Sequence, residues 1–147
     1  MYLDSCIIVK LLVTEPDSEF FIGSLEGEVL VTSELSQPEV FSALLARERA
    51  GKISAIDRRR AWKEFQARVA TEEIRIEPLE STVLRKAALL LERCHPQVPL
   101  RTLDALHLAT ADLCHDFPLT TTDGRLRDAA ILLGFQVFPP IDEKTPR

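Results

Sequence analysis

Apolar residues occur along the chain in two kinds of run, which predict two kinds of element. Short β-prone runs at residues 2–3, 29–32, 74–76, 119–121 and 135–138 are predicted to be strands. Longer runs, with apolar residues three or four positions apart, lie between them and predict helices. The expected helices cover residues 6–13, 17–25, 36–50, 54–70, 81–94, 102–114 and 125–133.

This alternation of strands and helices predicts an α/β fold. A strand that follows a crossover helix pairs in parallel with its predecessor, so we expect a three-layer α/β/α sandwich around a central, mostly parallel sheet. Ile74 and Ile76 alternate with charged residues, which places their strand near an edge. Residues 1–138 are expected to form one domain, and residues 139–147, rich in proline and polar residues, a loose tail.

Composition narrows the class of protein. The chain has 147 residues, of which 46% are hydrophobic and 28% charged, as expected for one globular domain. Its longest apolar stretch, residues 129–135, is far shorter than the roughly 20 residues of a membrane span. The N-terminus lacks the basic residues of a secretory peptide, and three cysteines leave one unpaired in any disulfide scheme. We therefore expect a cytoplasmic protein without a membrane partner.

Charge is unevenly distributed along the chain. The net charge of −5 argues against general attraction to nucleic acid. Residues 47–65, however, carry seven Lys or Arg against three acids, a local charge of +4, which leaves −9 for the remainder. This segment is either a helical hairpin that grips phosphates or an ordinary solvated helix face, and both interpretations remain open.

Four acidic residues stand at corresponding places, each at or near the start of a predicted helix. They are Asp4 and Asp123, directly after strands, and Glu39 and Asp104, in the first turns of helices. Each has a simpler explanation as a helix cap or dipole partner. That explanation is strongest for Glu39, because Ser36-x-x-Glu39 has the form of a capping box.

Asp104 is harder to explain as a cap. Its helix is apolar on nearly every side and is therefore expected to be buried. A carboxylate in such surroundings is costly unless a cation or several donors compensate it. His107, one turn further on, is a candidate partner, but we expect a core histidine satisfied by the backbone.

Taken together, the four acids predict a metal site. The expected topology brings the ends of the first, second and fourth strands to one edge of the sheet. Carboxylates gathered there repel one another unless a hard cation balances them, and all-oxygen ligation suits Mg²⁺ or Mn²⁺. One or two such ions can activate a water for attack on a phosphodiester.

Four segments of the chain resemble the PIN-domain ribonucleases, and more narrowly the VapC-type toxins of toxin–antitoxin modules. The segments are Asp4-Ser5, Pro38-Glu39-Val40, the run from Leu100 to Ala111, and the run from Thr121 to Leu126. The resemblance covers about residues 1–138, and the run from Leu100 to Ala111 is its most specific part.

The resemblance implies a PIN fold and a Mg²⁺- or Mn²⁺-dependent endoribonuclease that cleaves tRNA, rRNA or mRNA. It also implies a homodimer inhibited by a cognate antitoxin protein. The acidic residues of the family correspond to Asp4, Glu39, Asp104 and Asp123, as catalytic residues and metal ligands. Hydroxyls that often support such a site correspond to Ser5 and Thr121.

Two other functions remain open. A PIN-like binding module without catalysis would keep the fold but has little physical reason to keep all four acids. Phosphoryl transfer through an aspartyl-phosphate at Asp4 would resemble the haloacid-dehalogenase-like enzymes, which usually have a second Asp two residues after the nucleophile. Here that position is Cys6.

Overall fold

The computed structural model describes residues 1–140, which fold into five strands and seven helices. The strands are β1 (Tyr2–Leu3), β2 (Leu30–Ser33), β3 (Ile74–Glu77), β4 (Leu119–Thr120) and β5 (Val137–Phe138). The helices are α1 (Ser5–Leu12), α2 (Ser18–Leu25), α3 (Ser36–Arg49), α4 (Ala55–Ala70), α5 (Ser81–Cys94), α6 (Thr102–Cys114) and α7 (Gly124–Leu132).

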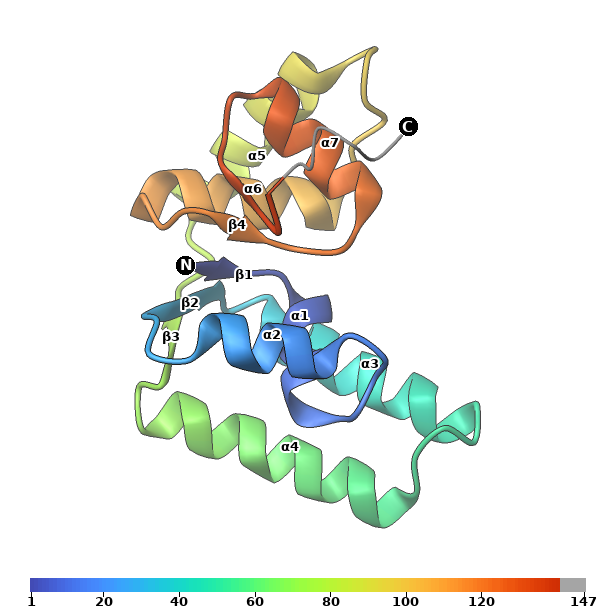
Figure 1. Cartoon of the computed structure of the whole chain (residues 1–147). Helices are drawn as coiled ribbons and strands as arrows, with labels where there is room; N and C mark the ends of the chain where they lie inside the picture. The colour runs from blue at the N-terminus through green and yellow to red at the C-terminus, as the bar shows by residue number, and fades with distance from the viewer. Residues whose placement is uncertain (141–147) are drawn as a thin grey trace.

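The five strands form one parallel sheet in the order β3-β2-β1-β4-β5. Helices α1–α4 cover one face of this sheet and helices α5–α7 cover the other (Figure 1). The predicted α/β/α sandwich is therefore confirmed, and β3 lies at an edge as its alternating pattern predicted.

Neighbouring residues of one strand serve opposite cores. Tyr2 and Val31 pack among side chains of α5, α6 and α7, whereas Leu3 and Leu30 pack among those of α1–α4. Successive side chains of a strand point to opposite faces, so a strand covered by helices on both sides must be apolar at every position. This explains why Tyr2-Leu3 and Leu30-Val31 are continuous apolar runs.

Element boundaries differ from the sequence prediction at strand ends. The second strand begins at Leu30 because Val29 is 65% exposed and its carbonyl accepts a hydrogen bond from the N-terminal amine. The fifth strand begins at Val137 because the Phe135 N–H closes the end of α7, bonding to the Ala130 carbonyl at 2.8 Å. Both residues are β-prone, but neither is paired as a strand residue in the sheet.

Two other expectations concern the ends and surroundings of the chain. The tail expected at residues 139–147 lies outside the described residues from position 141 onward. No helix among the described residues is both long and apolar enough to cross a membrane.

Two adjacent leucines of α5 test the layered packing. Leu90 is fully buried between the helices and the sheet, whereas Leu89 is 56% exposed. Leu90→Ala should lower the free energy of unfolding by about 2–5 kcal/mol, because it leaves a cavity in a close-packed core. Leu89→Ala should change it by no more than about 0.5 kcal/mol. Urea unfolding followed by circular dichroism measures both, and equal losses would contradict this packing.

Candidate active site

The four acidic residues lie beyond the carboxyl end of the sheet, in two pairs that each surround a cation of the chain. Asp4 follows β1 and Asp123 follows β4, and these two strands are adjacent in the sheet. The helices that come next, α1 and α7, lie on opposite faces of the sheet. Such a reversal of strand order opens a crevice outside the strand ends, where ligands bind in α/β sheets. The N-terminal ends of α1, α6 and α7 lie at this edge, on the right in Figure 1.

Arg101 joins two of the acids. Its Nε donates to Asp104 Oδ2 at 2.8 Å, and its Nη2 donates to Asp123 Oδ2, also at 2.8 Å. A second contact from Nη2 reaches Asp104 Oδ1 at 3.4 Å. The buried carboxylate of Asp104 therefore has the compensating cation that its surroundings require, and that cation comes from the residue before the helix.

His107 joins the other two acids, and the expectation of backbone contacts for this histidine was wrong. Its Nε2 lies 2.6 Å from Glu39 Oε2 and 3.9 Å from Asp4 Oδ1. Its Nδ1 lies 2.9 Å from the Tyr2 hydroxyl. Helix α6 turns this residue toward β1 and α3, so both ring nitrogens find side-chain partners rather than carbonyls.

The pKa of His107 reflects a competition between burial and charge. The imidazole is 1% exposed, and burial by itself lowers its pKa by disfavouring the charged form. The hydrogen bond to Glu39 and the charges of the nearby carboxylates outweigh burial, so the pKa is raised. Burial likewise raises the pKa of Glu39, but the hydrogen bond to His107 outweighs it and the net shift is downward. Both shifts favour an imidazolium–carboxylate pair.

Hydroxyl groups orient the remaining carboxylate oxygens. The Thr121 hydroxyl donates to Asp4 Oδ2 at 2.6 Å, and the Ser5 hydroxyl donates to Glu39 Oε2. Burial and the Asp4 charge raise the pKa of Cys6 to about 11, so its thiol stays protonated and donates to Asp4 Oδ2 at 3.0 Å. The two hydroxyls expected from the sequence thus lie on the acids, and the Cys6 thiol is an addition.

The capping interpretation holds for only one of the acids. Asp123 caps α7 by accepting from the Leu126 N–H at 3.0 Å, and uses its other oxygen for Arg101. Asp4 stands at the N-cap of α1 but makes no side-chain cap hydrogen bond.

The capping box expected at Ser36 and Glu39 is absent: α3 has no side-chain cap, and its N-cap position is Leu35. The Ser36 hydroxyl contacts other hydroxyls instead, and Glu39 turns to His107.

The donor set suits a hard cation, although the carboxylates are not gathered around one centre. Among residues 1–140, no group of three or more His, Cys, Asp or Glu side chains is arranged as a metal site. Instead each pair of acids faces a nitrogen cation of the chain itself. The four carboxylates, one arginine and one charged histidine together carry a formal charge of −2. The atoms that the acids offer to a metal are all oxygens, as Mg²⁺ and Mn²⁺ prefer.

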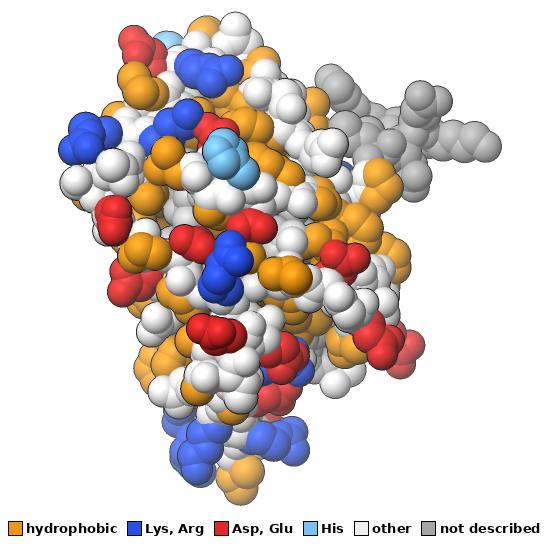
Figure 2. Space-filling view, turned by 90° about the vertical axis from the view of Figure 1, so that its left-hand side faces the viewer, with side chains coloured by type: hydrophobic (Ala, Val, Ile, Leu, Met, Phe, Trp, Pro, Cys, Tyr) orange, Lys and Arg blue, Asp and Glu red, His pale blue; other side chains and the backbone are white. Residues whose placement is uncertain are grey.

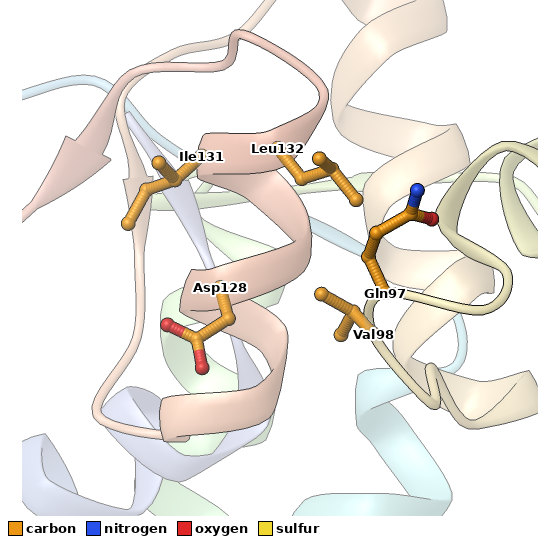
Figure 3. A pocket seen from close by; sticks show the side chains of 5 residues that line it. All are labelled: Gln97, Val98, Asp128, Ile131 and Leu132. Carbon is orange, nitrogen blue, oxygen red and sulfur yellow. The ribbon is translucent and has the colours of Figure 1, made fainter.

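A separate hollow of about 580 Å³ lies between α7 and the loop that joins α5 to α6 (Figure 3). Gln97 and Val98 from the loop face Asp128, Ile131 and Leu132 from the helix across it. None of the four candidate acids lines this hollow, so the acidic edge of the sheet is a different feature of the surface.

The chain is similar to known proteins along nearly its whole length. The model of the PIN domain matches residues 1–132. Ribonuclease VapC46 of Mycobacterium tuberculosis (strain ATCC 25618 / H37Rv) is 37% identical over 143 residues, which cover 95% of this chain and 97% of the relative. Ribonuclease VapC35 of the same species (strain CDC 1551 / Oshkosh) is 31% identical over 147 residues, which cover 95% of this chain and 96% of the relative.

The Glu39–His107 pair predicts a specific dependence of stability on pH. Because the pKa of Glu39 is lowered in the folded state, its contribution is present above about pH 4.3 and is lost as the pH falls through the lowered value. Because the pKa of His107 is raised, its contribution is present below about pH 6.5 and is lost as the pH rises through the raised value.

Glu39→Gln should therefore cost the most stability between about pH 4.3 and 6.5, and progressively less at higher pH. Urea unfolding across this range measures the cost, and NMR titration should show a fall in the pKa of His107. The exposed His95 and His115 serve as internal references. A cost that does not vary with pH would contradict the ion pair.

Proposed function

The chain belongs to the PIN-domain family, and we propose that it is a divalent-metal-dependent endoribonuclease of the VapC type. The activity is hydrolysis of RNA phosphodiester bonds, with Mg²⁺ or Mn²⁺ as the cofactor. The observation that carries this proposal is the convergence of Asp4, Glu39, Asp104 and Asp123 from four separate segments on one end of the sheet. Relatives that are named ribonucleases match the chain along nearly its whole length, which supports the same activity here.

The four carboxylates would hold the metal, directly or through water. When bound, the ion activates a water and stabilises the charge that develops on the phosphate. The chain keeps the acids ready for this in two ways. Thr121 and Ser5 fix the rotamers of Asp4 and Glu39 by donating hydrogen bonds. The buried His107 holds Glu39 beside Asp4.

The basic segment of residues 47–65, which covers the end of α3 and the first part of α4, supports an RNA substrate. Part of its charge is used within the protein, since three of its seven cations form ion pairs. In the described part of the chain the four others have no ion-pair partner, namely Arg49, Lys52, Arg59 and Lys63. The turn between these helices lies on the right in Figure 1, the side to which β1 runs. We propose that these four contact phosphates of RNA.

The opposite side of the molecule offers less to a polyanion. Figure 2 views that side and shows acidic and basic side chains interspersed, with Lys and Arg at the upper left and at the lower end. Mixed charge of this kind gives no extended positive field. We therefore place the RNA at the carboxyl edge of the sheet, close to the acids.

We further propose that the protein is the toxin of a toxin–antitoxin module, acts in the cytoplasm, and is a homodimer inhibited by a cognate antitoxin protein. The VapC-type relatives and the absence of a membrane-spanning helix among the described residues support this assignment. tRNA, rRNA and mRNA are the candidate substrates.

Two aspartates of α6 provide a matched test of the site. Asp104→Asn removes a proposed ligand, whereas Asp112→Asn removes a carboxylate two turns further along the same helix, where it pairs with Lys86. With total RNA and Mn²⁺, Asp104→Asn should lower the cleavage rate by at least about a hundredfold, the usual loss when one preorganised charge is removed. Asp4→Asn should have the same effect, and Asp112→Asn should cleave like the wild type.

EDTA should abolish cleavage by the wild type, and excess Mn²⁺ should restore it. Equal cleavage by the wild type and Asp104→Asn would refute this site. Calorimetric titration with Mn²⁺ separates the enzyme from a binding module that has lost catalysis, because the latter should show no heat that depends on Asp104.

A further inference from the structure

Arg101 lies between Asp104 and Asp123 and donates hydrogen bonds to both carboxylates. We propose that Arg101 is a displaceable internal counter-cation: a divalent ion takes its place on the two carboxylates, and the released guanidinium then binds a phosphate of the RNA. This inference rests on the proposed function and adds an order of binding to it, with the metal before the RNA.

The contacts of Arg101 show why metal and arginine compete. Its guanidinium contacts both oxygens of Asp104 and one oxygen of Asp123. The other Asp123 oxygen is already used, because it accepts the Leu126 N–H that caps α7. A hard cation would have to draw on the oxygens that Arg101 now holds, so binding must weaken or break these ion pairs.

Burial distinguishes Arg101 from the second cation of the site. The Arg101 side chain is 54% exposed, whereas His107 is 1% exposed and bonded at both ring nitrogens. Arg101 makes no side-chain cap bond to α6. Its guanidinium can therefore swing into water without uncovering apolar surface, and His107 cannot. Only one of the two cations is free to leave.

The released guanidinium suits the substrate. Within the described residues its side-chain hydrogen-bond partners are only Asp104 and Asp123, so a metal on these two carboxylates leaves its N–H donors free. A guanidinium binds phosphate through parallel hydrogen bonds, and here it stays at the mouth of the site on the residue before α6. Metal binding should therefore strengthen RNA binding, and RNA should strengthen metal binding to the same degree.

The test compares Arg101→Gln with Arg125→Gln. Arg125 is exposed, lies two residues after Asp123 and has no ion pair among the described residues, so its substitution removes the same charge without freeing a carboxylate. Calorimetry with Mn²⁺ on protein without RNA should show about two- to fivefold tighter binding for Arg101→Gln, since an exposed ion pair is worth roughly that factor. Arg125→Gln should bind Mn²⁺ within about twofold of the wild type.

RNA binding should change in the opposite direction. Fluorescence anisotropy with a labelled oligouridine should show that Mn²⁺ tightens binding by the wild type, with the integrity of the probe checked on a gel after each titration. For Arg101→Gln this enhancement should fall by about two- to fivefold, because the guanidinium that the metal would release is missing. A purely structural role for Arg101 would weaken both metal and RNA binding, so opposite signs separate the two explanations.

Each result has a defined meaning. If the wild type and Asp104→Asn release the same heat on titration with Mn²⁺, the proposed metal site is refuted, and the displacement with it. If the wild type binds Mn²⁺ at Asp104 but Arg101→Gln binds Mn²⁺ no more tightly than the wild type, the displacement is overturned. The proposed function is then unaffected. If Arg101→Gln fails to fold, Arg101→Lys keeps the charge but cannot span both carboxylates, so it should show the same two changes at smaller size.

Discussion

Repulsion among four carboxylates is the constraint on which the functional edge of this protein depends. Asp4, Glu39, Asp104 and Asp123 cannot stay ionised together without cations. The chain supplies two from α6 and its N-cap: His107 between Glu39 and Asp4, and Arg101 between Asp104 and Asp123. These cations stabilise the folded chain and leave the site with a formal charge of −2, so it still attracts a divalent ion.

The rest of the fold holds this balance in place. The strand order reverses between the parallel strands β1 and β4, which brings Asp4 and Asp123 to one crevice. Helix α6 packs against the sheet with one side, buries His107 and carries Asp104 at its first turn. Because the helices cover both faces of the sheet, its central strands β1, β2 and β4 are fully buried. A packed scaffold keeps carboxylates close despite their repulsion, at a cost that the internal cations offset.

Local patterns failed where a residue had a better distant partner. Ser36 and Glu39 have the spacing of a capping box, yet Ser36 bonds to other hydroxyls and Glu39 to His107. Val29 and Phe135 are β-prone, yet lie outside the strands. By contrast, the bounds of α5 and α6, which have 14 and 13 residues, agree with the prediction, because the backbone hydrogen bonds of a helix are made between residues four positions apart.

The sequence by itself determined the order of elements, the parallel sandwich and the set of candidate acids, because periodicity and capping act over a few residues. Only the tertiary structure decided which cation meets which acid. Glu39 and His107 are 68 positions apart, and Arg101 and Asp123 are 22 apart. No local pattern specifies such pairs, since they depend on how helices on different parts of the sheet turn their side chains toward a common edge. The balance of charge at the site is therefore a property of the packed fold.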